Sequence, residues 1–228
     1  MIIRRFFNAL IRLLARLLLR VQVTGLEHVP KEGRLIIMFN HINFLDGLLV
    51  LGSIPRDAVA MAKYEIFRDP VLGPLARLYG IFPVRRGEVD RRALQRAEKV
   101  LAKGQALLYS PEGHRSGHGR LQKAKNGLAY IALQTEATIL PVAVTGVEDF
   151  WRNIRYLRRT DVQVTVGRPF RFAKSQEQSS RDLRRELTAQ AMYQLAKLLP
   201  PRYRGFYDDL AQASEGRLQF LPLDVRSC

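Results

Sequence analysis

Short apolar segments alternate with helical patterns along most of this chain. The first, residues 34–39, follows Gly25 and Pro30 and ends just before the polar Asn40. An apolar run of that length, bounded by turn-forming residues, is typical of a buried strand. Further strands are expected over residues 58–62, 80–84, 106–109, 138–145 and 161–166. Strands that alternate with helices favour an α/β fold, here a mixed, largely parallel sheet flanked by helices.

The segments between these strands carry helical periodicity. The clearest, residues 89–103, has apolar side chains at helical spacing and Gly104 where a helix stop is expected. A polar stretch, 174–180, precedes a longer helical pattern that Pro200 and Pro201 end. The helices expected in this part of the chain are 70–79, 89–103, 127–134 and 181–199. Because sites in such folds gather at the carboxyl ends of strands, motifs that follow a strand carry extra weight.

Residues 1–20 have the pattern of a strongly amphipathic helix. At about 100° per residue, nearly all the large apolar side chains face one side. The other side carries Arg5, Arg12, Arg16 and Arg20. Two interpretations are open: an ordinary surface helix packed on the domain, or a helix in a membrane interface whose arginines meet lipid phosphates. We favour the interface, and we divide the chain into an amphipathic membrane-interface helix, 1–22, and a domain, 23–228.

Arginine interrupts the apolar run of this segment repeatedly. A secretory signal needs an unbroken apolar stretch of roughly 7 to 15 residues, and a spanning helix needs about 18. Neither cleavage nor membrane crossing is therefore expected. We expect a peripheral or monotopic protein on the cytoplasmic face of the cell membrane.

The chain is strongly basic. It has 37 Lys and Arg against 21 Asp and Glu, a net charge of +16 at pH 7, which draws a protein toward nucleic acid or an anionic membrane surface. The sequence has no zinc-finger spacing, aromatic RNA-binding signature or clear helix-turn-helix pattern, so we expect the membrane surface and no nucleic acid. The single cysteine, Cys228, excludes a disulfide framework within one chain and favours a reducing compartment.

The residues NHINFLD, 40–46, follow the first expected strand directly. A continuous helix would separate His41 and Asp46 by about 140°, so a strand, a turn and a helix start are needed to bring them together. In such a turn the aspartate fixes the histidine tautomer and leaves the other ring nitrogen free to take a proton from a hydroxyl. The pair is a candidate general base.

Three more blocks join an expected strand to a turn. They are GIFPVRRG at 80–87, YSPEGHRSG at 109–117 and ILPVAVTG at 139–146. In this order with NHINFLD, which has the HxxxxD spacing, they resemble the motifs of the glycerolipid acyltransferase family, which includes 1-acylglycerol-3-phosphate acyltransferases. The resemblance covers residues 23 to about 170, and LPPRYRGFY at 199–207 is similar to a tail common in this family.

The resemblance assigns roles to residues in each block. It implies that His41 and Asp46 are the catalytic pair. The substrate-binding residues that it implies are Arg85, Arg86, Glu112, Gly113, Arg115 and Lys125. For Glu112, the residues leave two roles open: contact with substrate, or support of its loop through backbone hydrogen bonds.

The chain departs from the family pattern at three positions. Arg85 stands where an aspartate is common, His114 where a threonine is usual, and Ala124 where an aromatic residue is usual. The departures at Arg85 and His114 bear on the identity of the acceptor, and they do not touch the catalytic pair.

The resemblance implies transfer of a fatty acyl group from acyl-CoA or acyl carrier protein to the free hydroxyl of a lysophospholipid. The first expected acceptor is 1-acylglycerol 3-phosphate, which gives phosphatidic acid. An arginine binds phosphate oxygens bidentately, so Arg86 and Arg115 are candidates for the acceptor phosphate. The thioester is already activated, so no metal or other cofactor is expected. The oxyanion donor stays open between backbone amides near Gly113 and near Val142.

Other functions stay open beside this one. The acceptor of an acyltransferase of this kind can also be glycerol 3-phosphate or a lyso-aminolipid. A zinc hydrolase would use His114 and His118, which share a helix face, but glycines crowd this segment and disfavour a helix. A non-enzymatic basic protein would bind nucleic acid or membranes through charge alone.

Overall fold

The computed structural model describes residues 2–85, 90–173 and 180–222. In these residues nine strands form one sheet, in the order β1-β7-β6-β2-β5-β3-β4, with β8 paired to β6 and β9 paired to β8. The strands are β1 (Leu19–Thr24), β2 (Leu35–Phe39), β3 (Ala58–Lys63), β4 (Phe82–Val84), β5 (Ala106–Tyr109), β6 (Thr138–Thr145), β7 (Thr160–Val166), β8 (Phe170–Phe172) and β9 (Leu218–Phe220). Only β6–β7, β6–β8 and β8–β9 are antiparallel among the described pairs. The predicted mixed, largely parallel sheet is confirmed.

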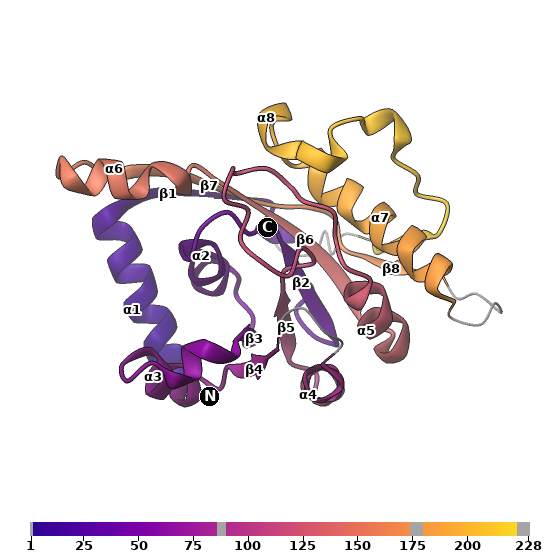
Figure 1. The fold of residues 1–228 in the computed structure, drawn as a ribbon, viewed down its shortest axis with the longest axis horizontal. Coiled ribbons are helices and arrows are strands. Elements are labelled where there is room, and N and C mark those ends of the chain that lie inside the picture. The colour runs from indigo at the N-terminus through magenta and orange to yellow at the C-terminus, as the bar shows by residue number, and fades with distance from the viewer. Residues whose placement is uncertain (1, 86–89, 174–179, 223–228) are drawn as a thin grey trace.

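Helices cover both faces of the sheet (Figure 1). One face carries α1 (Ile2–Leu18), α2 (Leu45–Ser53) and α3 (Leu72–Tyr79), and the other carries α4 (Arg91–Ala102), α5 (Gly127–Thr135) and α7 (Arg181–Lys197). Two shorter helices are α6 (Phe150–Arg155) and α8 (Pro201–Arg204). The described 3₁₀ segments are η1 (Leu26–His28), η2 (Tyr64–Arg68), η3 (Val147–Asp149), η4 (Gly205–Tyr207) and η5 (Leu210–Gln212).

Strand β2 lies at the middle of the sheet, and all its side chains are buried. Leu35, Ile37 and Phe39 belong to the core shared with α2, whereas Ile36 and Met38 belong to the core shared with α4, α5 and α7. A parallel strand buried on both faces has an unbroken apolar sequence, which is why the sequence predicts this strand. Its carboxyl end lies between those of its parallel neighbours β5 and β6.

The chain differs from the expected pattern at its amino terminus. Helix α1 ends at Leu18, and Arg20 belongs to β1, where it forms an ion pair of 3.6 Å with Asp161 of β7. Residue 22 therefore lies inside a strand, and the expected helix ends four residues earlier than the boundary drawn from sequence. The alternating pattern LRVQVT is typical of a strand. This strand follows the arginine-rich helix with no turn residue between them, so the sequence does not show where the helix ends and the strand begins.

Other differences concern short elements. The sequence does not predict α6, β8 or β9, because segments of three to six residues are too short for periodicity to show. Residues 86–89 and 174–179, which include the start of one expected helix and most of the polar linker, lie outside the described residues. Helix α4 begins at Arg91, after Asp90 accepts a hydrogen bond of 3.0 Å from the amide of Ala93. Among the described residues, no helix has the length and apolarity that crossing a bilayer requires.

Candidate active site

The site begins where β2 ends, at Asn40. The buried amide of Asn40 pairs twice with the backbone of Val144 in β6: Nδ2 donates to the carbonyl and Oδ1 accepts from the N–H, both at 2.8 Å. This side chain continues the sheet pairing beyond the end of β2 with the same donor and acceptor pattern as a strand. It thereby fixes the position of the next residue, His41.

His41 and Asp46 come together across a turn and the start of α2, as predicted. The distance between His41 Nδ1 and Asp46 Oδ2 is 3.2 Å. The Asp46 side chain is fully buried, whereas that of His41 is 16% exposed. Asp46 Oδ2 also accepts the amides of Ile42 and Asn43, both at 2.6 Å. Its place in the first turn of α2 lies at the positive end of the helix dipole, which favours a carboxylate.

The electrostatics of Asp46 combine opposing effects. Burial raises the pKa of Asp46 above its ordinary value, while the hydrogen bonds from His41, Asn43 and Ile42 act in the opposite direction. Its second oxygen, Oδ1, is buried with no hydrogen-bond partner among the described residues. When the Asp46 carboxylate accepts the Nδ1 proton of His41, Nε2 is the unprotonated ring nitrogen. The pair is therefore arranged to act as a base through Nε2.

Glu112 supports the backbone around the histidine. It is 1% exposed, and its two oxygens accept the amides of His41 and Gln122, each at 2.9 Å. Of the two roles open from sequence, these contacts favour support of the loop through backbone hydrogen bonds. Burial raises the pKa of Glu112 to about 7, against the effect of those two bonds.

The loop over residues 110–126 is irregular and is held at several points. The amide of Ser116 donates to the carbonyl of His41 at 2.7 Å. The carboxyl-terminal segment 199–207 holds the far side of the loop: Leu121 N–H donates to the Tyr203 carbonyl at 2.8 Å, and the Tyr207 hydroxyl accepts from the amide of Ala124 at 3.1 Å. The tail LPPRYRGFY therefore packs directly on the third motif block.

The predicted cationic residues that the structure describes differ in their contacts. Lys125 is exposed, and its side-chain carbons lie 3.4 Å from the position that a Cβ on Gly113 would take. Arg115 is exposed, with no hydrogen bond or ion pair in the described part of the chain. Arg85 follows the edge strand β4 and lies over the ring of Tyr64, 5.6 Å from its centroid. Arg86 lies outside the described residues.

The backbone amide of Gly113, where φ is +77°, donates to the Ser110 carbonyl at 3.2 Å. It is thus engaged in a turn, whereas the amides of His114 and Arg115 have no partner among the described residues. His114 and His118 lie in the irregular loop and do not share a helix face. No group of three metal-ligating side chains is present in the part of the chain that the structure describes.

Sequence reasoning missed the supporting residues of this site. Asn40 and Ser116 bond to partners far along the chain, and Gln122 bonds through its amide to Glu112 ten residues earlier. Asn40 alone has a visible signal, since a polar amide directly after a fully apolar strand needs a partner when buried.

Comparisons with known proteins agree on one family. A family model described as Acyltransferase matches residues 20–145, more than half of the chain. A 1-acyl-sn-glycerol-3-phosphate acyltransferase of Borreliella burgdorferi is 30% identical over 151 residues, 65% of this chain and 60% of that protein. One of Limnanthes alba is 33% identical over 149 residues, 64% of this chain and 52% of that protein. This chain thus spans between about half and three fifths of these curated relatives.

A solved structure extends the likeness beyond the matched segment. The crystal structure of the 1-acyl-sn-glycerophosphate (LPA) acyltransferase PlsC from Thermotoga maritima has a TM-score of 0.60 and 26% sequence identity. The likeness covers 83% of this chain and 74% of that one. The blocks at 40–46, 80–87 and 109–117 all fall within the residues that the family model matches.

Proposed function

The chain belongs to the acyltransferase family, and from this premise we propose that it transfers a fatty acyl group from a thioester to the free hydroxyl of 1-acylglycerol 3-phosphate, giving phosphatidic acid. The observation that carries this proposal is the His41–Asp46 pair, 3.2 Å apart at the end of the central strand. The names of the relatives support the same acceptor.

In the proposed reaction His41 is the general base. Nε2 takes the proton of the acceptor hydroxyl as its oxygen attacks the thioester carbonyl. Asp46 holds the ring through Nδ1 and stabilises the imidazolium that forms. Collapse of the tetrahedral intermediate breaks the C–S bond, and the thiolate takes the proton back from His41. The products are an ester and a free thiol, so the thioester, from acyl-CoA or acyl carrier protein, is the only co-substrate required.

Charge and loop geometry support a phosphate site beside the histidine. Arg115 and Lys125 belong to the loop that Glu112 and Ser116 tie to the backbone of His41. Arg115 would bind the acceptor phosphate, and Lys125 and Arg86 would add further positive charge. Holding the acceptor there orients its hydroxyl, and orientation of this kind supplies about 7 to 11 kcal/mol in well-placed reactions. The amides of His114 and Arg115, for which no partner is found among the described residues, are candidate oxyanion donors of this loop.

The exposed apolar side chains of α1 support a position of the protein at the membrane interface. Its Phe7 and Ile11 pack partly buried on the domain, and Arg4 is fixed by a 3.1 Å ion pair with Asp57. An ordinary surface helix would bury its apolar side, yet most of the large apolar side chains of α1 are exposed. They are Ile3, Phe6, Leu10, Leu13, Leu14, Leu17 and Leu18.

Other exposed apolar side chains lie near this surface. Leu72, Leu75 and Leu78 of α3 are exposed, and α3 lies on the same side of the sheet as α1 (Figure 1). Phe44, three residues after His41, stacks on Trp151 at 5.8 Å between ring centroids. An apolar surface that reaches the catalytic turn suits substrates that carry acyl chains. This surface supports a position at a membrane interface, held by α1 and its arginines. We propose the cytoplasmic face of the cell membrane.

The test is a substrate screen with the purified full chain in detergent. Labelled acyl-CoA and acyl carrier protein are each paired with 1-acylglycerol 3-phosphate, glycerol 3-phosphate and a lyso-aminolipid, and the products are identified by mass. We expect phosphatidic acid as the main product. Arg115→Gln should raise the KM for 1-acylglycerol 3-phosphate by about tenfold, the loss of one charge-assisted contact. A product from another acceptor alone would replace the proposed substrate, and no acyl transfer at all would reject the proposal.

A further inference from the structure

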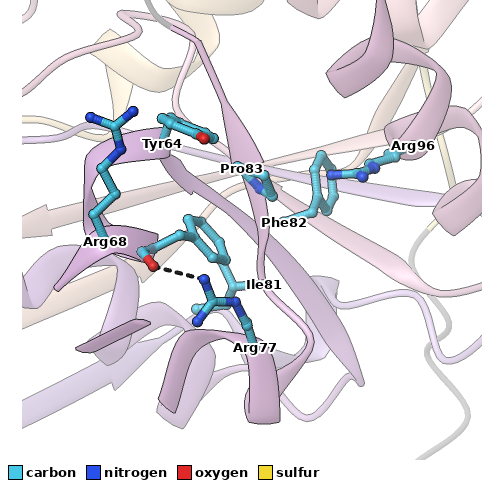
Figure 2. A pocket seen from close by; sticks show the side chains of 8 residues that line it. Tyr64, Arg68, Arg77, Ile81, Phe82, Pro83 and Arg96 are labelled. Atoms are coloured by element: carbon cyan, nitrogen blue, oxygen red, sulfur yellow. Dashed lines mark hydrogen bonds between the residues drawn. The ribbon is translucent and has the colours of Figure 1, made fainter. Parts of the chain in front are cut away.

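A concave site lies beside strand β4, and its lining includes no residue of the catalytic turn. It is a pocket of about 310 Å³ lined by Arg68, Arg77 and Arg96 together with the rings of Tyr64, Phe67 and Phe82. Figure 2 shows Arg68 and Tyr64 along one side and Arg96 extending beside Phe82 on the other. Among the described residues, none that lines it is a carboxylate.

A neighbouring pocket continues this positive lining. It measures about 280 Å³, shares Phe82 and Arg96 with the first, and adds Arg4, Lys99 and Lys103. Its described lining residues include no carboxylate, and of its cations Arg4 is already paired with Asp57. Pockets of this size lie near the lower end of the range for small-molecule sites. The several Arg and Lys side chains that line the two pockets favour a ligand with several negative charges.

The ring of Tyr64 carries two cations at once. The guanidinium groups of Arg68 and Arg85 lie 5.2 Å and 5.6 Å from its centroid. The Asp69 carboxylate accepts the amides of Val71 and Leu72. The Asp90 carboxylate accepts the amides of Arg85 and Ala93 and also attracts the Arg85 side chain, which leaves Arg68 with no carboxylate partner named among the described residues. Two like charges on one ring repel each other, and an anion between them would remove that cost.

The strand register connects this pocket to the catalytic turn. Ile37 is level with Leu108, Leu108 with Ala60, and Met61 with Phe82. Continued past the strand ends, the same register places Tyr64 and Arg85 level with His41. Three interstrand steps separate β2 from β4, about 14 Å at the usual spacing.

We propose that the pocket beside β4 binds the nucleotide phosphates of acyl-CoA, with its aromatic rings available to stack the adenine. The inference rests on the proposed function and adds the site of its donor. The phosphopantetheine arm has about the backbone length of four extended residues, roughly 13–14 Å, which is comparable to the spacing between β2 and β4. Acyl carrier protein carries the same arm on a single phosphate and has no adenine. The several cations and aromatic rings of the pocket therefore favour acyl-CoA over acyl carrier protein as the ligand.

Binding is measured first, without acyl transfer. The probes are CoA and adenosine 3′,5′-bisphosphate, titrated calorimetrically into the full chain, with inorganic phosphate and glycerol 3-phosphate as comparison ligands. The variant is the double substitution Arg68→Gln with Arg96→Gln, both exposed in the structure. Arg77 is left in place because it donates to the Phe67 carbonyl at 2.8 Å. Arg91→Gln is the control, since it lies on α4 about 140° from Arg96.

We expect both nucleotide probes to bind the double variant at least about tenfold more weakly, and the control to bind them like the unmodified chain. Equal affinities for the chain and the double variant would overturn the proposal. So would equally tight binding of inorganic phosphate, because the site would then hold any phosphate.

Kinetics then distinguish the donor from the acceptor. The double variant should raise the KM for acyl-CoA about tenfold and leave the KM for 1-acylglycerol 3-phosphate unchanged. A rise in the acceptor KM alone would assign the pocket to the lipid phosphate, and a rise only with acyl carrier protein would assign it to protein docking; either result overturns the proposal. If no acyl transfer occurs with any donor, the proposed function fails, while the calorimetry still decides whether the pocket binds nucleotide phosphates.

Discussion

The carboxylate of Glu112 binds the main chain of His41 and not its imidazole. Oε1 of Glu112 accepts the His41 amide at 2.9 Å, while Asp46 holds the ring through Nδ1 at 3.2 Å. The histidine is therefore fixed separately at its backbone and at its side chain. Because the other oxygen of Glu112 accepts the amide of Gln122, the same carboxyl group ties the end of β2 to the loop that carries Arg115.

Glu112 should make stability depend on pH. Burial raises the pKa of Glu112 from 4.5 to about 7. A raised carboxyl pKa means that its contribution to stability is complete below about pH 4.5 and is lost as the pH rises through 7. A rise of the pKa from 4.5 to about 7 corresponds to a loss of about 3 kcal/mol in the free energy of unfolding. Urea unfolding at pH 5, 6, 7 and 8, followed by the fluorescence of Trp151, measures this slope.

Glu112→Gln removes the titration and keeps the size of the side chain. Its one amide oxygen can serve only one of the two backbone amides, so at pH 5 we expect the variant to be less stable by about 1 to 3 kcal/mol. The difference between the two proteins should shrink or reverse by pH 8. Parallel stability curves across this range would show that Glu112 does not titrate there.

Asp46→Asn should impair catalysis more than folding. The amide cannot stabilise the imidazolium of His41 and does not fix the required tautomer, so we expect kcat to fall about 10²- to 10⁴-fold. His41→Ala should remove turnover altogether. Initial rates with saturating donor and acceptor measure both effects.

A matched control distinguishes a loss of catalysis from a loss of folding. His118→Ala removes an exposed histidine from the same loop region and should leave kcat unchanged. Thermal unfolding of all three variants checks that each retains its fold. Turnover by His41→Ala at the rate of the unmodified chain would refute the general-base mechanism.

The sequence predicts the catalytic turn because its signals are local. An unbroken apolar run marks β2, and the polar residues that follow place His41 and Asp46 around one turn. The supporting contacts are not local. Asn40 pairs with Val144, 104 positions away, and Glu112 bonds to a main-chain N–H that any residue at position 41 would provide. Spacing between side-chain types carries no information about such partners.

The two ends of the chain also show which features sequence patterns do not predict. The pattern of residues 1–20 predicts the helix but not the strand that follows it, because β1 continues from α1 with no turn residue between them. The tail 199–207 is visible as a motif, yet its contact with the loop at Leu121 and Ala124 depends on tertiary packing. The fold class and the catalytic pair follow from sequence, while the support of the site requires the structure.

Gly205→Ala should weaken that support. Gly205 has φ of +51°, and a Cβ there would lie 2.3 Å from the carbonyl oxygen of Leu121. The strained backbone alone costs about 1 to 3 kcal/mol, and the contact forces segment 199–207 away from the loop. Because small displacements of positioning groups cost up to about a hundredfold in rate, we expect kcat to fall at least about tenfold. Gly216→Ala, where the nearest atom lies 3.9 Å away, is the control. Equal rates and unfolding midpoints in the two variants would show that the tail does not position the loop.

The exposed side of α1 predicts how the protein binds membranes. Deleting residues 1–20 would also remove the buried Leu19 of β1, so point substitutions are the cleaner test. Phe6, Leu13 and Leu17 lie within about 40° of one another on the helix and are all more than half exposed. Replacing all three with Gln removes apolar groups worth about 1.5 to 3 kcal/mol each when buried. Sedimentation with vesicles should then show most of the variant in the soluble fraction.

The arginines of α1 should add a contribution that depends on lipid charge. Arg12→Gln with Arg16→Gln removes two cations worth about 1 kcal/mol each near an anionic surface, so binding to anionic vesicles should weaken about tenfold or more and binding to neutral vesicles should change little. Arg181→Gln with Arg185→Gln makes the same charge change on α7, on the opposite face of the sheet. If the α7 variant lost as much binding as the α1 variant, net charge alone would hold the protein to the membrane. Retention of full binding by both α1 variants would show that the helix is not the membrane contact.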